Sequence, residues 1–236
     1  LTLHLELDHD GCLPSFAVLT DGKRADITET RPWKFDPGSI LVFDRGYNDY
    51  GWFGQLHADK VFFVTRSKRG MAYKVVKDDR PLNHPSILGD ETIRLTGKAG
   101  QACTTPLRRV VYEDENKDVF FFLANNFRLE ATTIAAIYRD RWKIESFFKI
   151  LKQNLKIKTF LGTTRNAVWI QIWTALLTIL LLKYMQLRST FGWSLSNLLA
   201  LLRMNLFTYR DLWAWISTPF GVPPQPPDVV QYAMAF

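Results

Sequence analysis

Cysteine and histidine are scarce in this 236-residue chain. The two cysteines, Cys12 and Cys103, are too few for a disulfide framework, which excludes the disulfide-rich class of small secreted proteins. The four histidines show neither an HxH nor an HxxxH spacing, so no zinc site is indicated. A reducing cytoplasm is therefore the expected compartment.

A leader sequence and a long hydrophobic run are also lacking. Residues 1–7 alternate between apolar and polar, without the basic and then apolar regions of a signal peptide. The first residue is not methionine and the chain opens within a strand pattern, which predicts a fragment. The longest apolar run covers residues 168–182, whereas a membrane span needs about 20 residues. This run favours a buried core helix over a membrane-associated protein.

Positive charge is in modest excess. The chain has 30 basic and 23 acidic residues, a net charge of +7, and a pI near 9.4. Nucleic-acid-binding domains begin to cluster at this pI, although a mildly basic protein without a polyanion partner would look the same. Hydrophobic residues make up 47 % and charged residues 22 %, as in a globular protein with a substantial core.

The first third of the chain reads as a hairpin followed by a parallel unit. Residues 2–7 and 13–19 alternate around an Asp/Gly turn, which predicts a β-hairpin. Residues 39–43 form a continuous apolar run, typical of a strand buried on both faces. A helix over 48–58 and a strand over 61–65 complete a strand–helix–strand unit with parallel strands.

The remainder divides into a β-rich stretch and a helical part. Short strands are predicted within residues 67–127, at 73–77, 92–96, 107–112 and 118–123, with turn-rich stretches such as 96–100 between them. Helices are predicted over 130–155, 165–187 and 194–205. The predicted fold is α/β with four regions: core residues 1–66, a β-rich insertion at 67–127, core completion and helices at 128–215, and a Pro-rich tail at 216–236.

One predicted helix carries a charged stripe. At 100° per residue, Tyr138, Arg141, Glu145, Lys149 and Lys152 share one face, and the opposite face is apolar. Between residues 139 and 165 there are eight basic and two acidic residues, a balance of +6, and we expect Tyr138 and an aromatic neighbour, Trp142, to be exposed. Cations contact phosphates and aromatics stack on bases, so the stripe suits DNA. An ordinary solvated amphipathic helix is the alternative.

A second carboxylate follows the buried strand. Asp44 stands where functional groups collect in open α/β sheets, although it could equally cap the helix that follows. Asp44 and Glu145 together offer hard oxygen ligands for Mg²⁺, or for Mn²⁺ as its substitute. Two such ions about 4 Å apart would polarise a scissile phosphate and activate water or a 3′-hydroxyl.

The chain resembles insertion-sequence transposases of the DDE type, in the bacterial group with a β-stranded insertion. The signature of that group is Tyr, two residues, Arg, three residues, Glu, six residues and Lys, which Tyr138, Arg141, Glu145 and Lys152 match. The group's second aspartate lies in Asp-Arg-Gly-Tyr, as Asp44 does, and residues 62–66 and 123–126 are also similar. The resemblance covers roughly residues 1–187.

The resemblance implies a ribonuclease-H-like core, with the β-rich insertion between the last core strand and the Glu-bearing helix and a helical C-terminal part. It implies Mg²⁺-dependent cleavage of transposon ends and joining to target DNA, with Asp44 and Glu145 as catalytic metal ligands. Tyr138, Arg141 and Lys152 would grip phosphates, and we add Lys149 from the stripe. The implied partners are double-stranded DNA, both transposon ends and target, and a second copy of the chain bound to that DNA. No membrane is expected as a partner.

One departure concerns the family's first catalytic aspartate. The family carries it on a strand before the hairpin, and that strand is absent here. Asp8 and Asp10 lie in the hairpin turn, where turn propensity explains them, so neither is assigned as a ligand. We therefore expect this polypeptide alone to be inactive or crippled. A catalytically dead DNA-binding remnant and a different ribonuclease-H-like nuclease are the alternatives.

Overall fold

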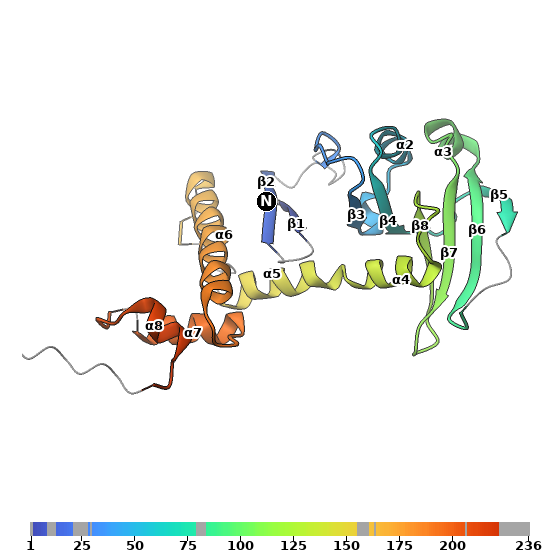
Figure 1. The fold of residues 1–236 in the computed structure, drawn as a ribbon. Coiled ribbons are helices and arrows are strands. Elements are labelled where there is room, and N and C mark those ends of the chain that lie inside the picture. The colour runs from blue at the N-terminus through green and yellow to red at the C-terminus, as the bar shows by residue number, and fades with distance from the viewer. Residues whose placement is uncertain are drawn as a thin grey trace, which may run out of the picture. The chain divides into compact units, whose positions relative to one another are not determined.

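The computed structural model describes residues 2–8, 13–20, 28, 30–78, 84–154, 161–162, 164–205 and 207–221 (Figure 1). The chain forms two compact units, Leu1–Ser146 and Phe147–Phe236. Unit 1 carries the strands and unit 2 is helical. Most of the predicted Pro-rich tail, together with Cys12 and Asp10, lies outside the described residues.

Unit 1 is built on a mixed six-stranded sheet with the order β3-β4-β8-β7-β6-β5. Parallel pairing joins β3 (Ile40–Phe43) to β4 (Phe62–Arg66), and the other neighbours are antiparallel. These are β5 (Tyr73–Asp78), β6 (Ile87–Leu95), β7 (Leu107–Glu113) and β8 (Val119–Ala124). The predicted hairpin is confirmed as a two-stranded sheet of β1 (Thr2–Asp8) and β2 (Leu13–Thr20).

Helices cover both faces of the six-stranded sheet. On one face, α2 (Tyr50–Ala58) packs Phe53 against Phe63 of β4, with ring centroids 4.5 Å apart, and α3 (Gly97–Ala102) lies next to α2. On the other face, α4 (Ala131–Arg139) buries Ile134 against Val110 and its neighbours. The α/β class is therefore confirmed, and this sheet is compatible with a ribonuclease-H-like core.

Three local predictions need correction. The strand over 39–43 is not buried on both faces: β3 is an edge strand, paired only with β4 among the described strands, and Ile40 is 39 % exposed. An apolar run indicates a strand but does not say whether it stands in the middle or at the edge of the sheet. The turn-rich stretch 96–100 contains the start of α3. The single helix over 130–155 is two helices, α4 and α5 (Trp142–Asn154).

The strands of the predicted insertion continue the core sheet. In particular, β8 pairs with β4 through Val64 and Ala124, and with β7 on its other side. Strands β5 to β8 thus extend the sheet that β3 and β4 begin. The insertion and the four domain boundaries stay predictions.

Unit 2 contains the end of α5, α6 (Arg165–Arg188), α7 (Leu195–Asn205) and α8 (Leu212–Ser217). Its core gathers Leu182, Trp193, Leu198 and Ile216, and the Trp193 indole donates to the Ile216 carbonyl at 2.6 Å. The two helices predicted over 165–187 and 194–205 are confirmed. The short α8 was not predicted.

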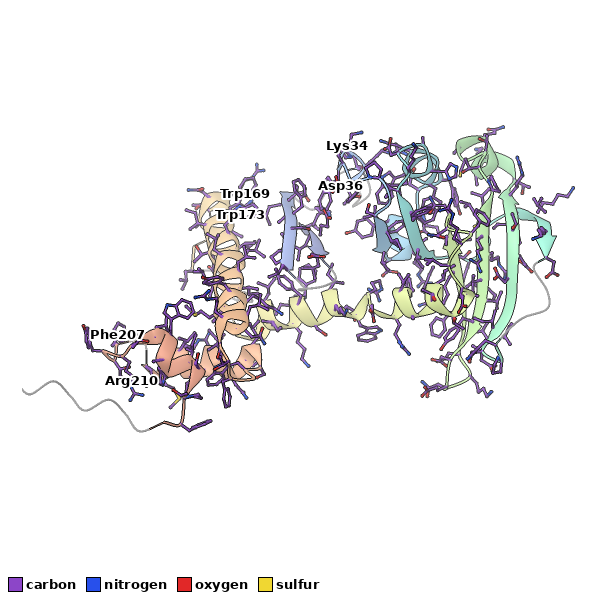
Figure 2. All side chains as sticks on the ribbon, in the orientation of Figure 1. Lys34, Asp36, Trp169, Trp173, Phe207 and Arg210 are labelled. Atoms are coloured by element: carbon purple, nitrogen blue, oxygen red, sulfur yellow. The ribbon has the colours of Figure 1, made fainter. Side chains whose placement is uncertain are left out.

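Helix α6 is only partly the buried core helix expected from residues 168–182. One side is buried at Ile172, Leu176 and Ile179, whereas Leu177 and Leu181 are about 60 % exposed. Trp169 and Trp173 stand one turn apart near its N-terminal end, as Figure 2 shows. Among the described residues this helix is long and apolar enough to cross a membrane, which is weak evidence on its own.

Candidate functional site

Asp44 follows the last residue of β3 and begins a short 3₁₀ turn, Arg45–Tyr47. Its carboxylate accepts a hydrogen bond from the Arg45 amide at 2.6 Å, so the capping role considered from the sequence is present. The residue is nevertheless exposed. A carboxylate has about four acceptor sites, and the cap uses one of them. Capping and ligand binding are therefore compatible at Asp44.

Asn48 fixes this turn to the end of β4. Its side-chain amide donates to the Arg66 carbonyl at 2.7 Å and accepts from the Thr65 hydroxyl at 2.8 Å. Its own carbonyl accepts from the Lys68 ammonium at 2.8 Å. Asn48 is 6 % exposed, so these bonds are shielded from water. Sequence reasoning missed Asn48, because an asparagine after a turn looks like an ordinary loop residue.

Glu145 lies in the first turn of α5, where a carboxylate is favoured by the helix dipole. Its oxygen Oε1 lies 2.8 Å from Nη2 of Arg141, four residues earlier. The glutamate side chain is 43 % exposed and the arginine side chain 20 %. Arg141 and Glu145 therefore lie side by side, as the helical projection predicted, and the guanidinium forms an ion pair with the carboxylate.

The turn between α4 and α5 keeps the first part of the stripe together. The Arg141 amide bonds to the Tyr138 carbonyl at 3.1 Å, and the Ile144 amide bonds to the Arg141 carbonyl at 3.1 Å. These bonds span three residues, as in a 3₁₀ turn, where side chains three apart are eclipsed. The Arg141 guanidinium accordingly lies over the Tyr138 ring, 5.6 Å from its centroid.

Tyr138 is not the exposed aromatic that the stripe predicted. It is 8 % exposed and its ring packs 5.0 Å from the ring of Phe122 on β8. The reason is that α4 turns this residue toward the sheet, a direction that a helical projection without a tertiary structure cannot give. Trp142 is confirmed as exposed, at 64 %.

Two polar atoms in this group are buried without a hydrogen-bond partner among the described residues. They are the Tyr138 hydroxyl and the Arg141 Nε. Burial raises the pKa of the Tyr138 phenol, and the nearby Arg141 guanidinium opposes that shift in pKa. The phenol therefore stays protonated at neutral pH and can donate a hydrogen bond.

Asp44 belongs electrostatically to the same group. Its negative charge raises the pKa of Tyr138, after the larger effects of burial and of Arg141. Burial lowers the pKa of Arg141, but the charges of Tyr138, Glu145 and Asp44 outweigh it and leave that pKa raised. Unit 1 thus brings four of the predicted residues, Asp44, Tyr138, Arg141 and Glu145, into one interacting set.

The two remaining site residues, Lys149 and Lys152, are exposed on the part of α5 that belongs to unit 2. Lysine side chains in such positions present mobile point charges to solvent. The neighbouring Lys143 instead forms an ion pair with Asp140 at 3.4 Å. The catalytic, metal-binding and DNA-binding roles of all six residues stay predictions.

The donor set at this site fits a divalent ion that is shared with a substrate. Within the described part of the chain, no cluster of three or more His, Cys, Asp or Glu side chains could hold a metal. Asp44 and Glu145 are both exposed carboxylates. Mg²⁺ is commonly bound by one or two carboxylates, with water and substrate phosphates completing its octahedron. Asp44 and Glu145 could thus supply two of the oxygen ligands of such an ion.

Comparison with known proteins gives a family model and several relatives. The model described as "Transposase DDE domain" matches residues 1–181. A putative transposase y4zB of Sinorhizobium fredii is 33 % identical over 228 residues, which cover 95 % of this chain and 64 % of the relative. A probable transposase for insertion sequence element IS5377 of Geobacillus stearothermophilus is 30 % identical over 78 % of this chain and 48 % of the relative.

A third relative is a putative transposase for insertion sequence element IS4SA of Synechocystis. It is 28 % identical over 61 % of this chain and 40 % of its own length. The chain thus spans about two thirds or less of the length of these relatives.

Proposed function

The chain belongs to the transposase DDE domain family, and on that premise we propose that it is the catalytic part of an insertion-sequence transposase. In this proposal it cleaves transposon-end DNA and joins it to target DNA by metal-dependent phosphoryl transfer. The observation that carries the proposal is the ion pair of Arg141 with Glu145 beside the Tyr138 ring, with Asp44 within electrostatic range of Arg141. These residues come from two distant segments of the sequence, and only the fold brings them together.

Asp44 and Glu145 are the proposed ligands of Mg²⁺, with Mn²⁺ as a substitute. When bound, such an ion would polarise the scissile phosphate, lower the pKa of a bound water or 3′-hydroxyl, and stabilise the leaving oxygen. The chain's own contribution is to hold both carboxylates accessible. The Asp44 cap and the Asn48 hydrogen bonds fix one of them, and the first turn of α5 fixes the other.

The cations and the phenol are the proposed DNA ligands. Arg141 can grip a phosphate with two parallel N–H donors, whereas Lys149 and Lys152 act as point charges. The buried Tyr138 hydroxyl needs an acceptor, and a phosphate oxygen would supply one. Double-stranded transposon-end and target DNA, a homodimer on that DNA and a cytoplasmic location complete the proposal.

A DNA-binding remnant without catalysis is the second candidate. It is favoured by one observation: the described residues form no cluster of three carboxylates, where the family resemblance implies three acidic residues. A remnant would keep the Tyr138, Arg141 and lysine contacts and bind DNA without cutting it.

One experiment distinguishes the two candidates. The 236-residue chain and its Glu145→Gln variant are assayed for binding and for Mn²⁺-dependent nicking of duplex DNA. Nicking by the chain that is lost in the variant, with binding retained, supports the transposase core. Binding without nicking supports the remnant, and a chain that neither binds nor nicks contradicts both. Lys117→Ala, on an exposed turn of the sheet, is the matched surface control.

A further inference from the structure

The ion pair of Arg141 and Glu145 puts a cation on a carboxylate that the proposed function assigns to metal. Nη2 of Arg141 and Oε1 of Glu145 are 2.8 Å apart, and the arginine side chain is only 20 % exposed. Partial shielding from water strengthens such a pair compared with a fully exposed one. An approaching divalent cation therefore has to compete with the guanidinium for this carboxylate.

The same guanidinium also interacts with the second carboxylate. Asp44 contributes to the raised pKa of Arg141 together with Glu145, so the cation lies within electrostatic range of both acids. The positive charge of Arg141 thus partly offsets the negative charges of Asp44 and Glu145, the two proposed metal ligands. An Arg141 that keeps this position would oppose the binding of a divalent ion at these carboxylates.

DNA can supply an acceptor for two donors in and beside Arg141. Its Nε and the Tyr138 hydroxyl are both buried and unpaired among the described residues, and the guanidinium lies over the Tyr138 ring. A buried donor without a partner is unfavourable. A phosphate oxygen near Nε and the hydroxyl would satisfy both donors and would draw the guanidinium away from Glu145.

We propose that Arg141 exchanges Glu145 for a DNA phosphate, so that DNA binding releases the carboxylate for the metal ion. The proposal rests on the function proposed above and adds an order of assembly to it. The metal ion is held weakly until DNA is in place, which protects the carboxylate pair from premature loading. Because coupling between two ligands is reciprocal, the metal ion also favours DNA binding by the same factor.

Mn²⁺ binding to the whole chain, followed by electron paramagnetic resonance of the free ion, tests the exchange. With a short duplex of mixed sequence present, Mn²⁺ is expected to bind roughly fivefold more tightly, the scale of one partly exposed ion pair. Arg141→Gln is expected to bind Mn²⁺ roughly fivefold more tightly without DNA, and to gain nothing further when DNA is added. Arg141→Lys keeps the charge and is expected to retain weak Mn²⁺ binding.

Lys143→Gln is the matched control, because it removes a neighbouring cation that forms an ion pair with Asp140. Its Mn²⁺ affinity should stay that of the wild type. In the reverse direction, Glu145→Gln frees Arg141 and should tighten metal-free DNA binding roughly threefold. Circular dichroism confirms that each variant is folded.

Two results would overturn the exchange. One is Mn²⁺ affinity that DNA leaves unchanged in the wild type, and the other is an Arg141→Gln variant that binds Mn²⁺ no more tightly than the wild type or the Lys143→Gln control. Both results leave the proposed function standing, because they concern the order of binding. A wild-type chain that binds neither Mn²⁺ nor duplex DNA overturns the exchange and the proposed function together.

Discussion

Arg108 and Asp90 form a two-bonded ion pair between neighbouring strands β7 and β6. Nε of Arg108 donates to Oδ1 of Asp90 at 2.8 Å, and Nη2 donates to Oδ2 at 2.6 Å. The remaining nitrogen, Nη1, donates to the carbonyl of Leu129, just before α4. The side chains are 9 % and 12 % exposed. One buried arginine thus ties the sheet to the segment that leads into the helix of Tyr138.

Removing one partner of this pair leaves a charge buried without compensation. Arg108→Ala is therefore expected to lower the free energy of unfolding by about 3–5 kcal/mol, as measured by urea denaturation. The surface pair of the exposed Lys117 and the half-buried Glu113 is the matched control, and Lys117→Ala should cost less than about 1 kcal/mol. Replacing both partners together, as Arg108→Met with Asp90→Leu, should recover most of the loss. A single variant as stable as the wild type would contradict the account.

Asn48 is expected to position Asp44 rather than to touch a ligand. Asn48→Ala leaves the Thr65 hydroxyl and the Arg66 carbonyl without their partner, at a cost of about 1–3 kcal/mol for each buried group. We expect lower stability in denaturation and weaker Mn²⁺ binding. Asn116→Ala, in an exposed turn, should change neither quantity.

A purely structural role for Asn48 would lower stability and leave Mn²⁺ affinity unchanged at a temperature where the variant is folded. Asn48→Asp separates the two further, because it can still accept from Thr65 but cannot donate to the Arg66 carbonyl. Its Mn²⁺ affinity should fall between those of the wild type and Asn48→Ala.

Lys149 and Lys152 are expected to contact phosphates without reading sequence. Each contact releases a counterion, so Lys149→Ala or Lys152→Ala should reduce the slope of log affinity against log salt by about 1. The affinity for unrelated duplexes should fall by a similar factor. Fluorescence anisotropy at several salt concentrations measures both. Lys117→Ala is the control, and an unchanged slope in both lysine variants would remove them from the DNA interface.

Tyr138→Phe is expected to alter the pH dependence of stability. Burial raises the pKa of the Tyr138 phenol above its ordinary value of 10.0, so the folded state holds this proton more tightly than the unfolded state. The resulting stabilisation is complete at pH values below the pKa of the phenol in the unfolded state. It is lost as the pH rises through the pKa of the phenol in the folded state. The variant lacks this loss, so its free energy of unfolding should fall less steeply above about pH 10.

At neutral pH, Tyr138→Phe should be as stable as the wild type or slightly more stable, because the buried hydroxyl has no hydrogen-bond partner in the described part of the chain. Burial also raises the pKa of Tyr50, so some alkaline loss should persist in the variant. Urea denaturation across the pH range measures both effects. Identical alkaline slopes for the two proteins would show that Tyr138 does not titrate as inferred.

Much of the local structure could be predicted from the sequence. The hairpin, the parallel unit of β3 and β4, and the helices α6 and α7 follow from short-range patterns of apolar and polar residues. Spacing also selected Tyr138, Arg141, Glu145 and Lys152, although the structure places Tyr138 in α4, Arg141 in the turn and the other two in α5. The ion pair of Arg141 with Glu145 keeps the expected separation of four residues.

The order of the strands in the sheet could not be predicted from the sequence. Pairing of β8 with β4 joins segments about 60 residues apart, and β3 stands at an edge where a continuous apolar run suggested the interior. Neither the pairing partner of a strand nor its place in the sheet can be read from the local sequence, because the same apolar run suits a central strand or a covered edge strand. The same reason explains the break between α4 and α5, which lies within an unbroken helical pattern.

The sequence by itself determined the residue types and spacings that give this chain its chemistry: an acid after a strand, and a phenol, cations and an acid along a helix. Only the tertiary structure decided that Tyr138 is buried against Phe122, that Asn48 holds the Asp44 turn, and that Arg141 interacts with both acids. Spacing along one helix is fixed by local backbone geometry. The meeting of Asp44 with α4 and α5 depends on packing about one shared sheet, which no local pattern encodes.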